Sequence, residues 1–558
     1  MNNQIDCLFI GHNEMDFDAY EKIVRAMGEH SGAYRDLNLN FVQYRRNFYT
    51  LSDVYNLFLG EDGQSVPLRL SDTFSATIAY LGTFLTRNGF SFDYISSFQA
   101  EKDILARKLT EDHYLVIGIL TTLYVAPFPI FEIISFIREH LPKVTIVVGG
   151  PFISTNTRAQ DQTALQSLFR AIGADIYINS SQGENTLIKV IRARKNHLPL
   201  SEVPNIYFAH NGDYLATPVD IENNLLEQNM VDWSLFREKA GRFVAVRTAI
   251  SCPFSCAFCG FPEHAGKYQT ASVEAIEREL DGLSQIETVT SINFIDDTFN
   301  VPPERFKDIL RMMIQKRYRF KWHSYFRCQY ADREMIELMK ESGCEGVFLG
   351  IESGNQQILK NMNKKVTLEK YRDGLALLKE MDIVTFASFI IGFPGETPGT
   401  IEDTMQFIEE TGPDFYRAQL WYCEPITPIW KEREQYQIEG AQFNWSHRTM
   451  DSNMACNLID KIFLSVKNSV WLPQYNFDFV NIFHLIHRGM SLQQVKRLIE
   501  TFNEGLKQKI IDPGQKEIGG AVIKRLVQLG MDAQGSPQPA AGKEINQRAF
   551  HYQADFDL

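Results

Sequence analysis

Residues 243–259 read FVAVRTAISCPFSCAFC, an apolar run followed directly by three closely spaced cysteines. The apolar run is typical of a strand that is buried on both faces. In the loop after it, the spacing of Cys252, Cys256 and Cys259 allows three thiolates to converge on one soft metal centre. Spacing alone leaves three readings open: an iron–sulfur cluster, a zinc site completed by His264, or three buried structural cysteines.

A βα rhythm starts at this stretch and continues downstream. Strand-like runs, most of them followed by an amphipathic helix, occupy residues 243–250, 289–295, 320–326, 346–351, 385–391 and 416–422. Six such units predict a partial (β/α)6 barrel over residues 241–430. In such barrels the chemistry lies at the carboxyl ends of the strands, which is where the cysteine loop begins.

The chain before the barrel also alternates strand and helix signals. Residues 144–150, VTIVVGG, indicate a buried strand that ends in glycines. Repeated βα units predict an α/β, doubly wound Rossmann-like domain over residues 1–200, with a ligand crevice at the carboxyl ends of its strands. Residues 25–70 fit this pattern poorly and are interpreted as an insertion. The other expected segments are a linker at 201–240, a helical C-terminal domain at 431–530 and a disordered tail at 531–558.

The composition of the chain limits which partners and which cellular compartment are expected. The 558 residues include 56 Lys and Arg against 69 Asp and Glu, and the net charge of −13 argues against a bulk electrostatic grip on nucleic acid or anionic lipid. Eight cysteines are too few for a disulfide scaffold. The N-terminus shows no signal-peptide pattern, and Gly and Pro interrupt the longest apolar stretch, Tyr114–Phe131. We therefore expect a cytoplasmic protein with reduced thiols, no membrane segment and no nucleic-acid partner.

The motif CxxxCxFC after a strand resembles the radical S-adenosylmethionine (SAM) superfamily. The resemblance implies that Cys252, Cys256 and Cys259 hold a [4Fe-4S] cluster. The iron without a protein ligand would chelate the amino and carboxylate groups of S-adenosylmethionine, whose reductive cleavage gives a 5′-deoxyadenosyl radical. An external electron donor for the cluster is therefore an expected partner.

Further landmarks of that superfamily follow the expected strands. The resemblance implies that Phe258 packs near the adenine and that Asp296 and Asp297, at the end of the second strand, lie near the methionine amine. It also implies cofactor contacts for Glu352, in the GIESG motif that ends the fourth strand, and for Gly392, in the GFPGE motif after the fifth. Taken singly, these two glycine motifs are equally compatible with tight turns.

The N-terminal pattern resembles the cobalamin-binding-type domain that precedes many radical enzymes of this superfamily. Gly149, Gly150 and Pro151 would form the glycine turn at the edge of its crevice. The chain contains no Asp-x-His-x-x-Gly motif, so a bound cobalamin would not be held by the histidine of that motif. The sequence leaves open whether this domain binds cobalamin or helps to hold a substrate.

Cys423 stands apart from the cluster motif, at the carboxyl end of the sixth expected strand. On position alone it is either a packing residue or a reactant. A thiol S–H bond is weak enough to return a hydrogen atom to a peptide Cα radical, and delivery to the opposite face gives the D-residue. Neighbouring strand residues point to opposite faces, so a donor role requires Cys423, and not Tyr422, to face the cavity.

This arrangement resembles the radical peptide epimerases of ribosomal peptide (proteusin) pathways. The resemblance implies an isomerase that epimerises residues of a precursor peptide, with Cys423 as the catalytic hydrogen donor. The rival family with the same two-domain layout is the cobalamin-dependent radical SAM methyltransferases, including the phosphinate P-methyltransferases. A third reading is a non-enzymatic, metal-stabilised binding module.

Overall fold

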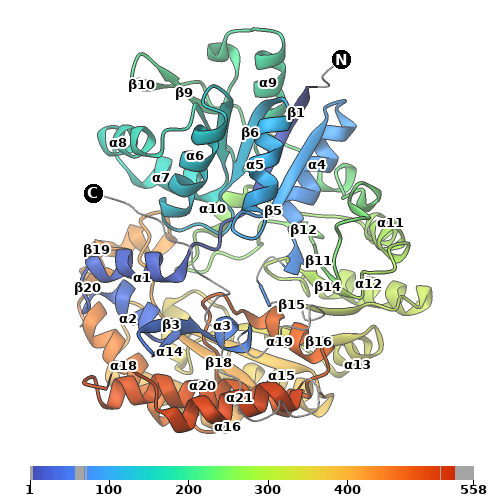
Figure 1. The fold of residues 1–558 in the computed structure, drawn as a ribbon. Coiled ribbons are helices and arrows are strands. Elements are labelled where there is room, and N and C mark those ends of the chain that lie inside the picture. Colours follow the sequence, from blue (N-terminus) through green and yellow to red (C-terminus); the bar gives the residue numbers. More distant parts are fainter. Residues whose placement is uncertain (1–3, 57–67, 70–71, 516, 534–558) are drawn as a thin grey trace, which may run out of the picture.

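The computed structural model describes residues 4–56, 68–69, 72–515 and 517–533, which form an N-terminal sheet domain above a barrel with C-terminal helices (Figure 1). The N-terminal sheet has the strand order β10-β9-β8-β7-β6-β1-β5. Its strands are β1 Ile5–His12, β5 Phe92–Ser97, β6 Tyr114–Leu120, β7 Thr145–Gly149, β8 Ile176–Ile178, β9 Ile206–His210 and β10 Asp213–Ala216. Five of its strands, β5, β1, β6, β7 and β8, are parallel. Their order is the flavodoxin-like one, whose switch point lies between β1 and β6. The predicted α/β doubly wound fold is confirmed.

Helices cover both faces of this sheet because alternate residues of its central strand enter two cores. Leu8 and Ile10 pack in the core that contains α5, α6, α7 and α8, whereas Cys7 and Phe9 pack in the core that contains α4 and α9. These helices are α4 Ala76–Arg87, α5 Lys102–Glu111, α6 Phe128–His140, α7 Pro151–Ala159, α8 Gln162–Ile172 and α9 Glu184–Lys195.

Part of the segment expected to be a linker belongs to this sheet. β9 and β10 form an antiparallel hairpin that extends the sheet beyond β8. Asn211 and Gly212 both have positive φ at its turn, the conformation that Asn-Gly favours between hairpin strands. Tyr214 then packs edge-on against Tyr177 of the sheet. The Asn-Gly pair was a readable hairpin signal, and the expectation of a linker over 201–240 was wrong for residues 206–216.

The barrel sheet is parallel throughout, in the order β22-β18-β17-β16-β15-β14-β11-β4. The six expected strands are present, and β4 and β22 extend the sheet at its two edges. The bounds are β4 Thr73–Phe74, β11 Phe243–Val246, β14 Ser291–Phe294, β15 Lys321–Phe326, β16 Cys344–Glu352, β17 Val384–Ile391, β18 Phe415–Leu420 and β22 Val470–Trp471. The helices α11 Val273–Ser284, α12 Pro303–Lys316, α13 Arg333–Glu341, α14 Gln356–Asn361, α15 Leu368–Glu380 and α16 Pro398–Thr411 alternate with these strands.

The first expected barrel strand is split in two. β11 ends at Val246, and β12 (Ala249–Ile250) leaves the barrel to pair antiparallel with β13 (Gln269–Thr270). This short ribbon brackets the cysteine loop, so both ends of the loop are fixed by backbone hydrogen bonds.

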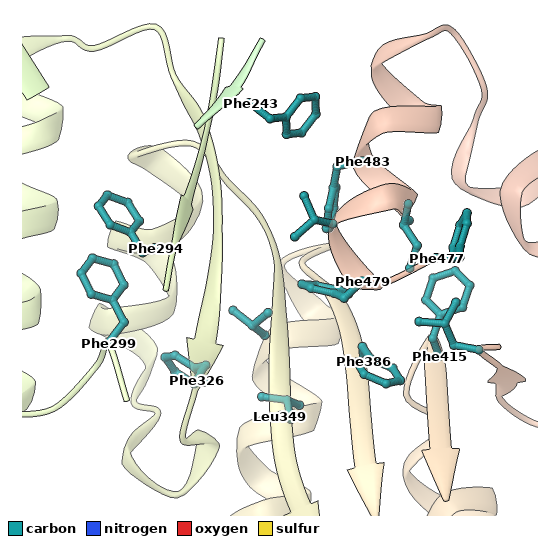
Figure 2. Packing of buried hydrophobic residues seen from close by; sticks show 14 of the residues in the cluster. Phe243, Phe294, Phe299, Phe326, Leu349, Phe386, Phe415, Phe477, Phe479 and Phe483 are labelled. Carbon is teal, nitrogen blue, oxygen red and sulfur yellow. The ribbon is translucent and has the colours of Figure 1, made fainter. Parts of the chain in front are cut away.

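Aromatic residues of helix α19 (Phe479–His487) close the amino-terminal end of the barrel (Figure 2). Phe483 stacks on His323 of β15 with ring centroids 4.4 Å apart, and His484 stacks on Phe243 of β11 at 3.6 Å. Burial holds the pKa of His323 well below its usual range, so the ring stays neutral in this apolar setting. His323 is therefore a core histidine.

The described part of the insertion within residues 25–56, with the helix that leads into it (α1 Phe17–Ala26), packs on the C-terminal region. It contains α2 Gly32–Asn38, β2 Phe41–Tyr44, β3 Asn47–Thr50 and α3 Leu51–Asn56. The C-terminal region comprises α17 Arg433–Tyr436, β19 Glu439–Ala441, β20 Asn444–His447, β21 Met450–Asp451, α18 Ser452–Ser465, α20 Leu492–Ile511 and α21 Gly520–Ala533. Of the expected disordered tail, residues 534–558 lie outside the described residues. No helix in the described part of the chain is long and apolar enough to cross a bilayer.

Candidate functional site

The three clustered cysteines lie in the loop between β12 and β13, and their thiols are close to one another. Burial raises the pKa of Cys259 to about 12, and the thiols of Cys256 and Cys252 also raise it. Across the described residues, no three His, Cys, Asp or Glu side chains are placed to hold a single metal ion. This arrangement is compatible with a cluster, because each thiolate then binds a different iron.

The side chain of His264 contacts the N-terminal domain and not the cysteines. Its Nδ1 lies 3.0 Å from the Ser154 hydroxyl and its Nε2 lies 3.2 Å from the Thr155 hydroxyl, both on helix α7. The zinc reading needed this side chain as the fourth ligand. With both ring nitrogens engaged by α7, that reading has no support from the geometry.

Asp296 supports the entrance of the cysteine loop. Its Oδ1 accepts hydrogen bonds from the backbone N–H groups of Thr248 and Ala249, at 2.6 and 2.9 Å, and its Oδ2 interacts with the Thr248 hydroxyl. Arg305 donates to the Thr248 carbonyl at 2.9 Å, from the other side of the same bend. The carboxylate is buried and engaged by three donors, so the structure gives Asp296 a positioning role, and its expected cofactor contact stays a prediction.

Asp297 has a different environment from its neighbour. Its side chain is solvent-accessible, yet surrounding protein raises its pKa to about 7, with a further contribution from Asp296. Its charge also raises the pKa values of Cys252, Cys259 and Tyr325. Asp297 is therefore close enough to Cys252 and Cys259 to influence the pKa values of both thiols, and its expected contact with the methionine amine stays a prediction.

A buried ion pair lies beside the cysteine loop. The Lys364 ammonium is 2.8 Å from Glu352 Oε1 and lies 5.4 Å from the centre of the Phe258 ring. Glu352 has a φ of +71°, at a register shift in β16. Arg327 donates to the Lys364 carbonyl at 3.1 Å and covers the Phe254 ring at 3.7 Å. The structure thus brings the predicted residues Glu352 and Phe258 together through Lys364, which carried no recognisable sequence signal.

Gly392 forms a tight turn. Its φ is +92°, and a Cβ would lie 2.3 Å from the Trp445 ring. The Glu396 carboxylate closes the turn by accepting from the N–H groups of Gly392 and Phe393, at 2.6 and 3.1 Å. His447 is 2.9 Å from the Gly392 carbonyl. These contacts show that the GFPGE motif forms a tight turn, and the expected cofactor contact of Gly392 stays a prediction.

Cys423 lies beyond the end of β18 and has no exposed surface. Its backbone N–H and carbonyl both bond to Gln442, at 3.0 and 2.7 Å. Tyr422, the residue before it, lines a cavity together with Gln442 and Phe443. Cys423 is therefore buried while its neighbour meets the cavity, and its expected role as a hydrogen donor stays a prediction.

The carboxyl edge of the N-terminal sheet carries the predicted glycine turn. Gly150 has a φ of +119°, and a Cβ there would lie 2.7 Å from the Thr121 hydroxyl. Helices α7 and α9 have Gly150 and Gly183 as their N-caps. In α9 the N–H groups of Asn185 and Thr186 donate to the Glu222 carboxylate, at 2.9 and 3.0 Å, so the start of this helix is already capped. In the loop after β6, Leu123 and Val125 are 65% and 72% exposed. This edge combines a glycine turn at the start of α7 with an exposed apolar surface.

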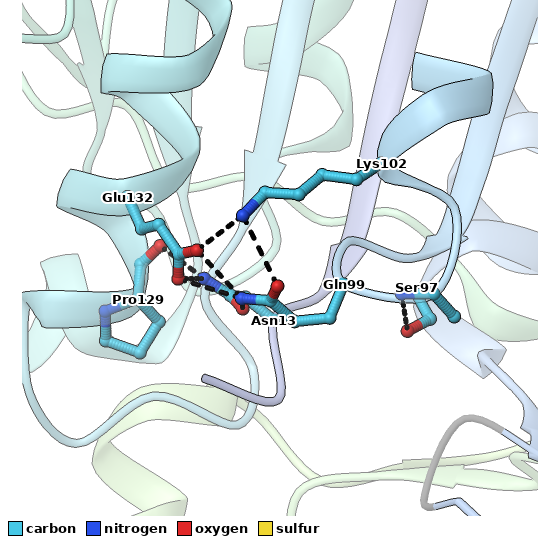
Figure 3. Close-up of polar contacts among 7 residues, drawn as sticks. Asn13, Ser97, Gln99, Lys102, Pro129 and Glu132 are labelled. Atoms are coloured by element: carbon cyan, nitrogen blue, oxygen red, sulfur yellow. Dashed lines mark hydrogen bonds and ion pairs between the residues drawn. The ribbon is translucent and has the colours of Figure 1, made fainter. Parts of the chain in front are cut away.

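A polar network ties the strand ends at the switch point (Figure 3). Glu132 of α6 accepts from Asn13 Nδ2 at 2.9 Å, from Gln99 Nε2 at 2.8 Å and from Lys102 Nζ at 2.8 Å. Although burial raises the pKa of Glu132, these hydrogen bonds hold it below its usual range. The loops after β1 and β5 are thereby joined to α6.

The cysteine loop docks on this carboxyl edge. Helix α10 (Phe261–Ala265), directly after Cys259, places His264 against α7, and a Cβ on Gly266 would lie 3.2 Å from the Ser181 hydroxyl after β8. The cysteines of the barrel and the crevice edge of the N-terminal sheet therefore face each other. The sequence placed each site on its own domain but did not predict this juxtaposition.

Comparison with known proteins supports the interpretation of the cysteine loop and of the two-domain fold. Residues 247–408 match the model of the Radical SAM superfamily. An uncharacterised methyltransferase of Pyrococcus horikoshii is 25% identical over 353 residues, which cover 61% of this chain and 73% of that protein. The anaerobic magnesium-protoporphyrin IX monomethyl ester cyclase of Rubrivivax gelatinosus is 21% identical over 492 residues, which cover 82% of this chain and 84% of that protein. The solved radical SAM methyltransferase TsrM of Kitasatospora setae, with cobalamin and a [4Fe-4S] cluster bound, has a TM-score of 0.54 at 19% identity and covers 66% of this chain and 72% of that one.

The barrel region is a radical SAM domain, and it is combined with an N-terminal domain of the cobalamin-binding type of fold. This confirms the resemblance seen in the sequence. A radical SAM domain uses a [4Fe-4S] cluster and S-adenosylmethionine. In this chain Cys252, Cys256 and Cys259 are the residues that fit the cluster.

Proposed function

We propose that this protein is a cobalamin-dependent radical SAM methyltransferase. The observation that carries the proposal is the docking of the cysteine loop, through His264, on the helix that starts at the glycine turn. That contact places the cluster motif opposite the carboxyl edge where a doubly wound sheet binds its ligand. The methyltransferases among the similar proteins favour this function over peptide epimerisation, which was the first expectation from the sequence.

The crevice edge fits a cobalamin by the chemistry of its groups. The positive end of the α7 dipole lies at this edge and favours the phosphate and amide oxygens of such a ligand. Gly150 leaves space for close approach, and the exposed side chains of Leu123 and Val125 offer an apolar surface for a flat macrocycle. A bound cobalamin supplies a transferable methyl group.

The chain's own residues would prepare the barrel side of this space. Asp296 and Arg305 hold the bend that presents the cysteines. Asp297 offers a carboxylate for the methionine amine of S-adenosylmethionine, and Lys364 with Glu352 fixes the wall beside Phe258. These groups orient ligands without themselves changing covalently.

Anaerobic reconstitution tests the proposed cofactors. The full chain should bind iron, sulfide and cobalamin, the last seen by its visible absorbance. Cys252→Ala/Cys256→Ala/Cys259→Ala should lose the iron but keep the cobalamin, because the cobalamin crevice lies on the other domain. Cys456→Ala, a buried cysteine outside the loop, should keep both. A folded wild-type chain that binds iron but no cobalamin would remove this proposal.

The reaction is tested in deuterium oxide on two kinds of acceptor. One is a precursor peptide that is co-expressed with the enzyme, and the other is a phosphinate natural product that is added to it. Mass spectrometry should show a methyl increment that survives in Cys423→Ala. One incorporated deuterium per site, lost in Cys423→Ala, would instead support epimerisation with Cys423 as the donor.

A further inference from the structure

A cavity of about 750 Å³ lies where the insertion, the barrel and the N-terminal sheet meet. Its lining comes from the segment between Tyr20 and Asn40, the end of β18, the turn at 441–444 and the loop after β6. The insertion, which the doubly wound pattern did not explain, therefore forms one wall of a chamber that is large enough for a small organic molecule or a peptide side chain.

Arg417 of β18 is one of the residues that line this cavity, and two of its nitrogen donors lack a hydrogen-bond partner among the described residues. The side chain is 1% exposed, and its Nη2 donates to Asp36 Oδ1 at 3.0 Å. Its guanidinium lies 4.4 Å from the centre of the Trp471 ring. Within the described residues, Nε and Nη1 have no hydrogen-bond partner. A buried guanidinium with unused donors is costly, and an acceptor delivered by a ligand would remove that cost.

The neighbouring polar side chains already satisfy one another. Gln419 donates to Gln474 at 2.8 Å, the Gln474 backbone N–H donates to Asn40 at 2.8 Å, and Asn40 donates to the Asp36 carbonyl at 2.7 Å. This chain of bonds fixes the polar end of the cavity around Arg417. The unmet demand there is for an acceptor, and a carboxylate meets it with a charge-assisted hydrogen bond.

The remaining walls are aromatic and apolar. Tyr20 stacks on Tyr475 with ring centroids 5.4 Å apart, and Tyr422 packs edge-on against Phe443 at 4.9 Å. Such walls suit the apolar or aromatic body of a ligand whose anionic end reaches Arg417.

The cavity also borders the loop after β6 and the segment after β18 that leads to the cysteine loop. Val125 and Ala126 line it from the loop at the carboxyl edge of the N-terminal sheet. On the barrel side, Tyr422 is followed by a segment that packs on the cysteine loop, because a Cβ on Gly260 would lie 2.7 Å from Ile426. A ligand in the cavity is thus next to both domains.

We propose that this cavity is the substrate site, and that Arg417 anchors a carboxylate, or a comparable oxyanion, of a substrate with an apolar or aromatic body. The word substrate rests on the proposed function, but binding of the anion does not. Binding can therefore be measured on the full chain without cofactors, and a failure to load cobalamin leaves this measurement unaffected.

The probe is para-fluorophenylbutyrate, compared with its neutral primary amide by fluorine NMR. The acid should bind the wild-type chain, and the amide should bind at least about tenfold more weakly. Asp36→Asn should strengthen binding of the acid, because it removes the carboxylate that competes for Arg417. Asp36→Asn/Arg417→Met should abolish the preference for the acid without leaving an unpaired buried charge.

Three outcomes would overturn the proposal: no binding of the acid, equal binding of acid and amide, or an acid preference that survives in the double variant. Thermal denaturation of each variant shows that the compared proteins are folded. Arg138→Lys, at a partly buried arginine of α6 that pairs with Asp175 outside the cavity, is the control and should leave the acid preference unchanged.

Discussion

At the residue scale, Asp296 and Asp297 show how neighbours acquire different roles. Asp296 is buried and accepts from the backbone at Thr248 and Ala249, whereas Asp297 is exposed and raises the pKa values of Cys252 and Cys259. Both residues lie in the loop after β14, whose backbone directs the Asp296 carboxylate inward and leaves Asp297 at the surface.

Asp296→Ala should lower the free energy of unfolding by about 1–3 kcal/mol and reduce iron retention, because buried N–H groups lose their acceptor. Asp297→Ala, which removes no such bond, should keep its iron. Urea denaturation and iron analysis after anaerobic reconstitution measure both effects. Equal iron loss in the two variants would contradict a positioning role for Asp296.

Glu396 makes stability depend on pH. Burial raises its pKa from the usual 4.5 to about 8, so the folded state keeps a proton that the unfolded chain releases. Its contribution is complete below about pH 4.5 and is lost as the pH rises to about 8. The slope from this group is at most about 1.4 kcal/mol per pH unit.

Glu396→Gln should flatten this part of the pH dependence, measured by urea denaturation across the same window. Glu402→Gln, at an exposed carboxylate on the helix that follows Glu396, should leave the slope as in the wild type. Identical slopes in Glu396→Gln and the wild type would refute the assignment.

At the element scale, the short helix α10 joins the two domains. His264 meets two hydroxyls of α7, and burial lowers its pKa to about 4, so the contact is made by a neutral ring at neutral pH. The sequence reading treated His264 as a candidate zinc ligand because the distant Ser154 and Thr155 are not visible from local spacing.

His264→Ala should lower the free energy of unfolding by about 1 kcal/mol while the iron content stays unchanged, because the ring holds α7 and not the metal. Glu263→Ala, the neighbouring position, provides the control. Iron loss confined to His264→Ala would instead identify His264 as a ligand.

At the scale of the whole molecule, the insertion near the N-terminus packs against helix α18 of the C-terminal region. Arg35 of α2 pairs with Asp460 of α18 at 2.5 Å and donates to Asn457 at 2.7 Å. These residues are more than 400 positions apart in the chain. The insertion is therefore part of the barrel's surroundings, although it interrupts the N-terminal domain in sequence.

Arg35→Ala and Asp460→Ala should each cost about 0.5–1 kcal/mol, because the pair is only partly buried. A double-mutant cycle by thermal denaturation should give a coupling energy of similar size. Strict additivity of the two substitutions would mean that the pair contributes nothing to holding the insertion.

The strands and the cysteine motif could be predicted from sequence patterns because both depend on local chemistry. Buried parallel strands read as apolar runs, and the thiolate spacing lies within a single loop. The hairpin at 206–216 also carried a local signal, Asn211-Gly212, but was read as a linker. Lys364, Arg305 and Arg417 carried no such signal, because an ordinary surface cation and a buried one look alike in sequence.

The sequence by itself determined the two-domain α/β architecture, the barrel strands and the three cysteines that fit a cluster. Only the tertiary structure decided that Asp296 supports a loop, that Gly392 forms a turn and that Cys423 is buried. It also decided the pairing of Arg417 with Asp36, across 381 positions of chain. Local propensity and spacing are written in neighbouring residues, whereas burial and charge pairing arise from contacts between distant segments that exist only after folding.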